Sequence, residues 1–273
     1  MRQARVVGFV DAGAESGDTV SAALSVEVGG TLLDASGHTD RGSVRAENQD
    51  RWAVAELPGE AGVLLVVADG MGGHAGGAEA ASGAVGALVD VVTAAADAHA
   101  ALAAGFDAAT QAVAAHRRGF GGMVMGTTLV AAVVSPNRVT VGNVGDSRAY
   151  LVRDSRPAVV TVDHTWIAAE VMAGRLDPVT AAHDPRRNML LRAVTGEPVD
   201  VDVFSVEPAG GDVLLLCSDG VWGSIDDDGI AAICSADQGG DELPRTLCDG
   251  ALDAGSADNV TAVLCRVGQR GQR

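Results

Sequence analysis

The sequence predicts a mixed α and β fold in which sheets are covered by helices. Apolar runs of strand length recur along the chain, and longer Ala-rich stretches with apolar residues on one side lie between some of them. Several of the short runs follow one another directly, as hairpins do, instead of alternating strictly with helices. This clustering favours helices packed on antiparallel sheets over a repeated strand–helix–strand unit.

The expected elements follow the chain in order. A weak apolar alternation over 23–33 predicts the first strand, and further strands are predicted at 62–68, 127–134, 138–144, 148–152, 199–206, 212–217 and 260–267. Helices are predicted at 78–96, 100–116, 165–174, 226–235 and 241–253. Ser135-Pro136-Asn137 reads as a tight turn between two strands, which predicts an antiparallel hairpin there.

The length allows one large domain or two small ones, since the chain has 273 residues of which 47% are hydrophobic. We expect one domain over 23–268. A loosely ordered extension over 1–22 is expected before it, because this stretch lacks clear periodicity, and a short tail over 269–273 after it.

Membrane insertion and secretion are not expected, although mean hydropathy is +0.20. The apolar runs end early at acidic residues such as Asp69 and Asp219, and none reaches the roughly 20 residues that a bilayer requires. Arg2 and Arg5 precede an apolar stretch that is too short for a secretion signal. The expected location is the cytoplasm.

Composition argues against several partners. The chain has 36 acidic and 19 basic residues and a formal charge of −17, which repels nucleic acid and anionic membranes. It contains no Lys, so a Schiff base or a P-loop lysine is excluded, and anion recognition falls to arginines, backbone amides or metals. The four cysteines form no CxxC pair, which indicates buried, reduced thiols.

Aspartates lie where the predicted strands end: Asp69 after 62–68, Asp146 after 138–144, Asp219 after 212–217 and Asp258 before 260–267. One such residue is typical of a turn. Four brought together would repel one another and raise one another's pKa unless cations lie among them. Hard oxygen ligands beside glycines suit Mg²⁺ or Mn²⁺ better than Zn²⁺. Two such ions would activate a bridging water, which predicts a hydrolase of phosphate esters.

Six sequence blocks occur in a fixed order: 39–50 (TDRGSVRAENQD), 68–74 (ADGMGGH), 126–128 (GTT), 145–148 (GDSR), 217–220 (CSDG) and 258–261 (DNVT). In this order the chain resembles the metal-dependent protein phosphatases of type 2C, in particular their compact bacterial branch, over about residues 35–267. The resemblance implies an α+β fold in which two antiparallel sheets pack as a sandwich flanked by helices. It also implies a binuclear metal centre at one end of the sheets.

The resemblance also implies roles for individual residues. Asp69 matches the carboxylate that bridges both metals, and Gly70 the carbonyl donor to one of them. Asp219 and Asp258 match the ligands of the other metal. Asp50 matches the acidic residue near the metal-bound waters.

Arg45 matches the arginine that grips the substrate phosphate, and a guanidinium fork can chelate two phosphate oxygens. Asp146 and Asp219 match residues that hold a third ion in many relatives. Many relatives also have Asp four residues after the position of Asp219, whereas this chain has Gly223. The expected cofactors are therefore two core Mn²⁺ or Mg²⁺ ions with a weak third.

The function expected from this resemblance is hydrolysis of phosphoserine and phosphothreonine in proteins, the substrates of a Ser/Thr kinase in bacterial signalling, by a monomer. Two alternatives remain open. A pseudophosphatase that only binds or regulates is favoured by Gly223 and by Gln49, where many members carry Glu. A phosphatase of small phosphorylated metabolites would use the same site and differ at its rim.

Three further residues have two interpretations each. His74 is a candidate general acid, although a loop residue that fixes the glycine-rich turn is at least as consistent with its position. His183 falls in a segment that resembles the variable flap of the family, where a structural or rim role is favoured over catalysis. Arg148 is expected to pair with a carboxylate.

Overall fold

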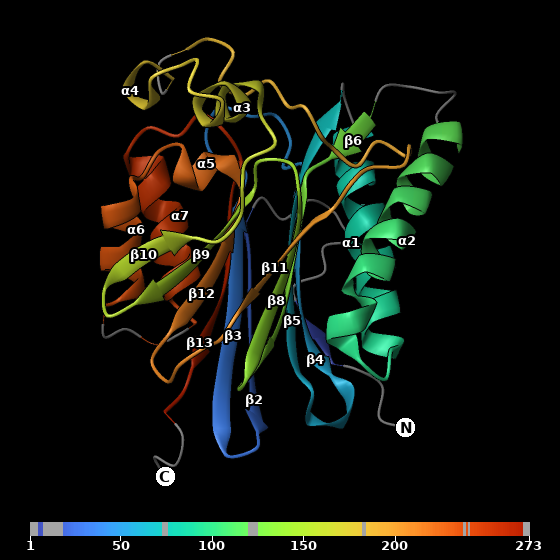
Figure 1. The fold of residues 1–273 in the computed structure, drawn as a ribbon, viewed down its shortest axis with the longest axis vertical. Helices are drawn as coiled ribbons and strands as arrows, with labels where there is room; N and C mark the ends of the chain where they lie inside the picture. The colour runs from blue at the N-terminus through green and yellow to red at the C-terminus, as the bar shows by residue number, and fades with distance from the viewer. Residues whose placement is uncertain are drawn as a thin grey trace.

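The computed structural model describes residues 5–7, 19–72, 76–119, 125–181, 184–236, 239 and 241–269. Two antiparallel sheets pack face to face in the middle of the molecule, and helices cover both outer faces (Figure 1). This arrangement confirms the expected α+β sandwich flanked by helices.

Within the described residues, the first sheet has seven strands, β1 (Val6–Val7), β4 (Asp50–Leu57), β5 (Gly62–Gly72), β6 (Met125–Thr127), β7 (Leu129–Ser135), β8 (Arg138–Val144) and β11 (Asp202–Val206). Their order is β1-β4-β5-β7-β8-β11, with β6 paired to the end of β5, and all pairs are antiparallel. Ser135 pairs with Arg138 across the β7–β8 hairpin, which confirms the predicted turn.

In the part of the chain that the structure describes, the second sheet has six strands, β2 (Thr19–Val28), β3 (Thr31–Asp40), β9 (Arg148–Arg153), β10 (Arg156–Val159), β12 (Val213–Cys217) and β13 (Val260–Val267). Their order is β10-β9-β12-β13-β3-β2. Strand β2 begins at Thr19, before the expected domain start at 23. Residues 19–22 continue the alternation of exposed and half-buried side chains, so they pair with the end of β3. With β1, they bring parts of the expected extension into both sheets.

The helices are η1 (Pro58–Glu60), α1 (Gly76–Ala94), α2 (Ala98–Gly119), α3 (Trp166–Met172), α4 (Pro178–Ala181), α5 (Asp219–Trp222), α6 (Asp227–Cys234) and α7 (Leu243–Asp253). The five longest lie within three residues of the predicted bounds at each end. Helices α1 and α2 flank the first sheet, and α5, α6 and α7 flank the second. The predictions missed α4 and α5, which have a single turn each.

Helix α1 corrects the expectation that no segment is long and apolar enough to cross a bilayer. It is the one helix among the described residues that meets this length and composition. Of its most apolar stretch, 56% is buried, and the helix packs against β4, β5 and α2. In this fold α1 is therefore a core helix of the sandwich.

The core between the sheets is built around Trp52 of β4, which is fully buried. A Cβ atom on Gly37 of β3 would lie 2.4 Å from the Trp52 ring. The indole thus fills the space that the missing side chain of Gly37 leaves. This packing ties β3 to β4, the two strands that lead into and out of the loop at 41–49.

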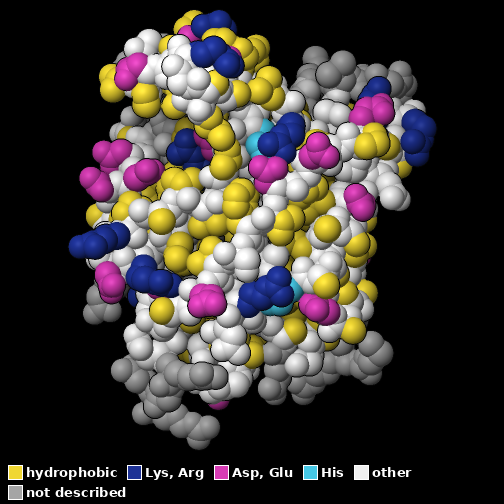
Figure 2. All heavy atoms as spheres, viewed as in Figure 1, with side chains coloured by type: hydrophobic (Ala, Val, Ile, Leu, Met, Phe, Trp, Pro, Cys, Tyr) yellow, Lys and Arg dark blue, Asp and Glu magenta, His cyan; other side chains and the backbone are white. Residues whose placement is uncertain are grey.

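Acidic and basic side chains are interspersed on the face of the molecule that Figure 2 shows. On the face in Figure 2, arginine side chains lie singly or in small groups among acidic ones and do not form one continuous basic area. Arg153 and Arg192, for example, pair with Asp212 and Asp202. Phosphate recognition therefore rests on individual arginines in particular positions.

Candidate metal centre

One end of the sandwich, where β6 and α5 lie in Figure 1, gathers five aspartates that are far apart in the sequence. Asp50 begins β4 and pairs in register with Asp69 of β5. Asp146 lies in the β8–β9 turn, Asp219 is the first residue of α5, and Asp258 lies just before β13. The structure thus brings together all five acidic residues that the sequence singled out.

Asp69 and Gly70 lie inside β5, whereas the sequence predicted that this strand ends at Ala68. The strand continues because it changes partner, from β7 to the short strand β6. Thr128 Oγ1 accepts from the Asp69 N–H at 2.9 Å, and the Asp69 carbonyl accepts from Thr127 Oγ1 and from the Thr128 N–H, each at 2.9 Å. The backbone that carries the Asp69 carboxylate is therefore fixed on both sides.

Glycines allow β5 and α1 to approach closely beside this carboxylate. A Cβ on Gly70 would lie 2.2 Å from the Gly77 carbonyl oxygen, and a Cβ on Gly77 would lie 2.6 Å from Gln49 Oε1. The Gly70 N–H donates to the Gln49 carbonyl at 3.2 Å. Gln49 thus lies against both glycines, with its side-chain amide beside Gly77 and its backbone carbonyl beside Gly70.

Two hydroxyl groups hold Asp50. Ser218 and Thr261 each donate to Asp50 Oδ2 at 2.7 Å. Burial raises the pKa of Asp50 to about 6 against the opposing effect of these hydrogen bonds, and the charge of Asp258 adds to the increase. Sequence analysis missed both hydroxyl residues, although each lies in a quoted block, Ser218 before Asp219 and Thr261 after Asp258.

Asp219 carries a polar atom without a partner. Its Oδ1 is buried and makes no hydrogen bond with the described residues. Burial raises the pKa of Asp219 to about 7, and the charges of Asp146 and Asp258 add to the increase. Burial also raises the pKa of Asp69 well above its ordinary value, with further contributions from Asp50 and Asp219. A buried, unpaired carboxylate oxygen among like charges is costly unless a cation neutralises it.

Asp146 is mostly buried as well, with 5% of its surface exposed. Burial raises its pKa to about 6, and the charge of Asp163 contributes. Gly223, at the end of α5, has φ −75° and ψ −12°. Its backbone is therefore in the ordinary right-handed region.

The donors fit a hard divalent cation, because they are carboxylate oxygens and one of them is orphaned in a buried place. Among the described residues, no three acidic, histidine or cysteine side chains already close around a single point. Asp258 is instead paired with Arg45, with 2.5 Å between Oδ2 and Nη2. Among the described residues, the charges that act on Asp69 come from aspartates and not from the histidine or cysteine donors that Zn²⁺ prefers.

Arg45 lies at the rim of the site, with 52% of its side chain exposed. The loop that carries it is held by Asn259, which donates to the carbonyls of Arg41 and Glu47 and accepts from the Gln49 N–H. The Arg41 guanidinium in turn donates to the Arg45 carbonyl. Sequence analysis quoted Asn259 in its block but did not identify it as the residue that shapes this loop.

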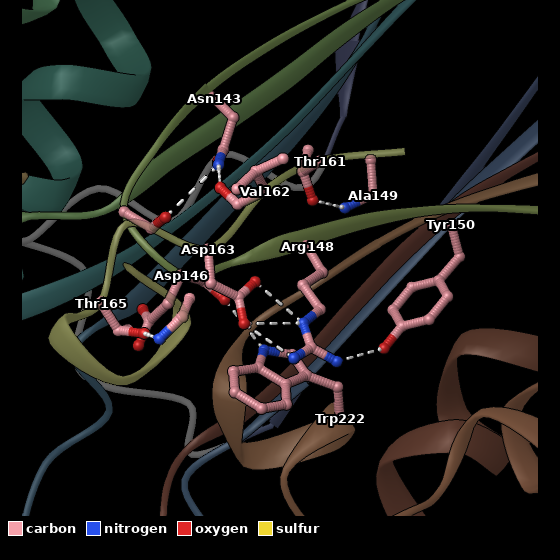
Figure 3. Close-up of polar contacts among 12 residues, drawn as sticks. Asn143, Asp146, Arg148, Ala149, Tyr150, Thr161, Val162, Asp163, Thr165 and Trp222 are labelled. Carbon is pink, nitrogen blue, oxygen red and sulfur yellow. Dashed lines mark hydrogen bonds and ion pairs between the residues drawn. The ribbon is translucent and has the colours of Figure 1, made fainter. Parts of the chain in front are cut away.

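The remaining candidates divide into two groups. Arg148 forms a two-point ion pair with Asp163, as expected, and Figure 3 shows it between Asp163, Tyr150 and Trp222. His74 and His183 lie outside the described residues, so both interpretations of each stay open.

Comparisons with known proteins identify the family of this chain. A family model described as protein phosphatase 2C matches residues 37–235. The serine/threonine protein phosphatase PstP of Mycobacterium tuberculosis is 36% identical over 240 residues, which are 86% of this chain and 45% of PstP. The chain thus spans about half the length of that relative. The serine/threonine phosphatase stp of Listeria welshimeri is 32% identical over 234 residues, 83% of this chain and 92% of stp.

Solved structures show the same architecture. The catalytic domain of PstP, crystallised with two manganese ions, superposes with a TM-score of 0.77 at 34% identity, over 88% of this chain and all of that one. Stp1 of Staphylococcus aureus superposes with a TM-score of 0.80 at 30% identity, over 88% of this chain and 97% of Stp1. The chain belongs to the protein phosphatase 2C family.

Proposed function

We propose that the chain is a metal-dependent protein phosphatase that hydrolyses phosphoserine and phosphothreonine. The observation that carries this proposal is the group of buried and half-buried aspartates around the orphaned Oδ1 atom of Asp219. The stp relative, which this chain matches over most of its length, is named a serine/threonine phosphatase. One solved relative holds two manganese ions.

In this proposal Asp69, Asp219, Asp258 and the Gly70 carbonyl hold two Mn²⁺ or Mg²⁺ ions. Bound there, two such ions supply an activated water and neutralise charge on the phosphoryl oxygens. Asp50 would lie near the metal-bound waters, and Ser218 and Thr261 fix the direction of its carboxylate. A third ion would bind weakly at Asp146 and Asp219, since no carboxylate is available at Gly223.

Arg45 would receive the substrate phosphate. Its guanidinium is half exposed at the rim and 2.5 Å from Asp258 Oδ2, so a bound phosphate would lie next to a metal ligand. Planar donors of this kind bind two oxygens of one phosphate. Asn259 keeps the loop in place while the side chain stays accessible.

The proposed partners are phosphorylated proteins that a Ser/Thr kinase produces, and the proposed location is the cytoplasm, where the chain would act as a monomer. A pseudophosphatase is not favoured, because all five aspartates of the site are present and gathered at one end of the sandwich. Gln49 and Gly223 change the surroundings of these carboxylates without removing any of them.

The test measures hydrolysis by the metal-depleted and by the Mn²⁺-loaded chain. Three kinds of substrate are compared: an aryl phosphate, phosphoserine and phosphothreonine peptides, and a panel of small phosphorylated metabolites. We expect Mn²⁺-dependent hydrolysis that EDTA abolishes, with kcat/KM highest for the phosphopeptides. Absence of turnover on every substrate would support the pseudophosphatase instead. A preference for a metabolite would move the substrate class to small molecules.

A further inference from the structure

Each nitrogen of the Arg148 guanidinium donates to a side chain inside the protein, and the guanidinium also stacks on an aromatic ring (Figure 3). Its Nε and Nη2 donate to the two oxygens of Asp163, at 2.9 and 2.7 Å, and its Nη1 donates to the buried hydroxyl of Tyr150 at 3.0 Å. The guanidinium carbon lies 3.6 Å from the centre of the Trp222 ring. Such a combination of fork and stack restricts the side chain to one position.

Trp222 connects α5, the helix that begins with Asp219, to the β8–β9 turn that carries Asp146. It lies on α5, three residues after Asp219, and its indole N–H donates to the Asp146 carbonyl at 3.0 Å. The turn that carries Asp146 and the helix that begins with Asp219 are therefore joined through this one indole ring. The Arg148 guanidinium stacks on the face of the same ring.

The same arginine fixes the Asp146 turn from a second direction. Asp163, its ion-pair partner, precedes His164, whose N–H donates to the Gly145 carbonyl at 2.9 Å. The Gly145 N–H donates back to His164 Nδ1 at 3.1 Å. Gly145 directly precedes Asp146, so the segment that Arg148 holds also holds this turn.

The contacts of Trp222 and Arg148 oppose a repulsion between Asp146 and Asp219. Asp146 and Asp219 each carry a carboxylate in a largely buried place, and like charges there drive the turn and α5 apart. The indole hydrogen bond and the guanidinium stack oppose that separation. Cation affinity depends on how closely the protein holds its carboxylates at the required separation before the ion arrives.

We infer that Arg148 is a positioning residue of the metal centre, which fixes Asp219 relative to Asp146 through Trp222 and Asp163 and thereby sets the affinity for Mn²⁺. This inference rests on the proposed assignment of Asp219 as a metal ligand. Arg148 itself touches neither the ion nor the substrate in this role.

The test measures Mn²⁺ binding directly, by titration calorimetry on the metal-depleted chain, so it needs no turnover. Arg148→Lys keeps the charge but loses the fork and most of the stack. We expect it to weaken the tightest Mn²⁺ binding by about tenfold or more, the range seen when partners behind metal ligands are removed.

Arg153→Lys is the matched control. Arg153 lies on the same strand, β9, and forms the same two-point ion pair with a carboxylate, Asp212, at 2.8 and 2.6 Å. We expect the Mn²⁺ affinity of Arg153→Lys to stay within about twofold of the wild-type value. The reason is that the Arg153 side chain pairs with Asp212 and not with a proposed metal ligand. Thermal unfolding of the metal-free variants should show similar losses for both, which separates metal positioning from general stability.

Two more variants keep the outcomes distinct. Trp222→Phe retains a ring for stacking but lacks the N–H donor to Asp146, and it should weaken Mn²⁺ binding even if Arg148→Lys fails to fold. Asp219→Asn tests the proposed assignment of Asp219 as a metal ligand. An unchanged isotherm for Asp219→Asn would overturn the proposed ligand. A weakened one, together with wild-type binding by Arg148→Lys or by Trp222→Phe, would overturn only the role of Arg148.

Discussion

Asp50 and Asp69 are direct partners across β4 and β5, so a buried and a half-buried carboxylate share one register position at the end of the first sheet. Ser218 and Thr261 satisfy one oxygen of Asp50, and Thr127 of β6 and the following Thr128 fix the backbone of Asp69. Such a pair is unfavourable in a folded protein unless protons or cations accompany it. The stability of this fold and the chemistry of its site therefore depend on the same groups.

The metal-free chain is expected to lose stability as pH rises from about 4 to about 7. Folding raises the pKa of Asp50 to about 6 and that of Asp219 to about 7, from an ordinary value of 3.8. In this window the folded chain binds protons that the unfolded chain has released, so the free energy of unfolding falls with increasing pH. Thermal unfolding of the metal-free chain from pH 4 to pH 8 measures it.

Asp219→Asn serves as the reference for this effect, because it removes one of the titrating groups. The stability of Asp219→Asn should decline less steeply with pH than that of the wild type. Added Mn²⁺ should raise the stability of the wild type most at the upper end of this pH range. Parallel profiles for the two metal-free proteins would show that Asp219 does not titrate as its surroundings imply.

Removal of a single core carboxylate should abolish most of the turnover. Asp69→Asn and Asp258→Asn each leave the remaining aspartates poorly neutralised around fewer ligands, and we expect kcat to fall by at least about a hundredfold at saturating Mn²⁺. Steady-state kinetics on a phosphopeptide measures this, with circular dichroism to verify folding. Asp34→Asn, on β3 and bonded to Ser25, is the matched control and should retain activity. Near-native turnover by Asp69→Asn would refute its assignment.

Arg45→Ala should affect substrate binding more than the chemical step. Arg45 faces the rim and pairs with Asp258, and a side chain that binds phosphate equally in the ground and transition states contributes mainly to KM. We expect KM for a phosphopeptide to rise by about tenfold or more, the size of one charge-assisted contact, with a smaller change in kcat. An unchanged KM would reduce Arg45 to a partner of Asp258.

How far the sequence predicted the fold depended on length and periodicity. The long helices α1 and α2 and the β7–β8 hairpin were predicted because their apolar patterns and turn residues are local signals. Strand β4 was missed because it is buried on both faces, apart from Glu56, and so lacks alternation. It also begins with the charged pair Asp50-Arg51, which reads as a loop in the sequence.

The site could be predicted as a set of aspartates but not as an arrangement. Their positions at predicted strand ends were visible, because an acidic residue after an apolar run is a local feature. The hydroxyls on Asp50 were not, since Ser218 is 168 residues away and Thr261 is 211 residues away in the sequence. The link between Trp222 and Asp146 likewise depends on how α5 packs beside the β8–β9 turn.

Gly223 lies at the end of α5, four residues after Asp219. Its φ of −75° removes the concern that a side chain would be strained there. A Cβ would lie 2.6 Å from the Asp219 carbonyl oxygen, so the end of α5 must shift slightly, and we expect a modest loss of thermal stability. Gly223→Asp should nonetheless lower the Mn²⁺ concentration that activates the enzyme in the millimolar range, because a third carboxylate joins Asp146 and Asp219.

Gly223→Asn is the control for this variant, since it has nearly the same size and the same backbone demand without the charge. Activity is titrated with Mn²⁺ for the wild type and both variants, and thermal unfolding is measured alongside. A leftward shift for Gly223→Asp alone indicates that charge at position 223 controls the weak ion. If both variants fold and their titrations coincide with that of the wild type, the weak site is set by other residues, and Asp146 and Asp219 hold that ion without help from the end of α5.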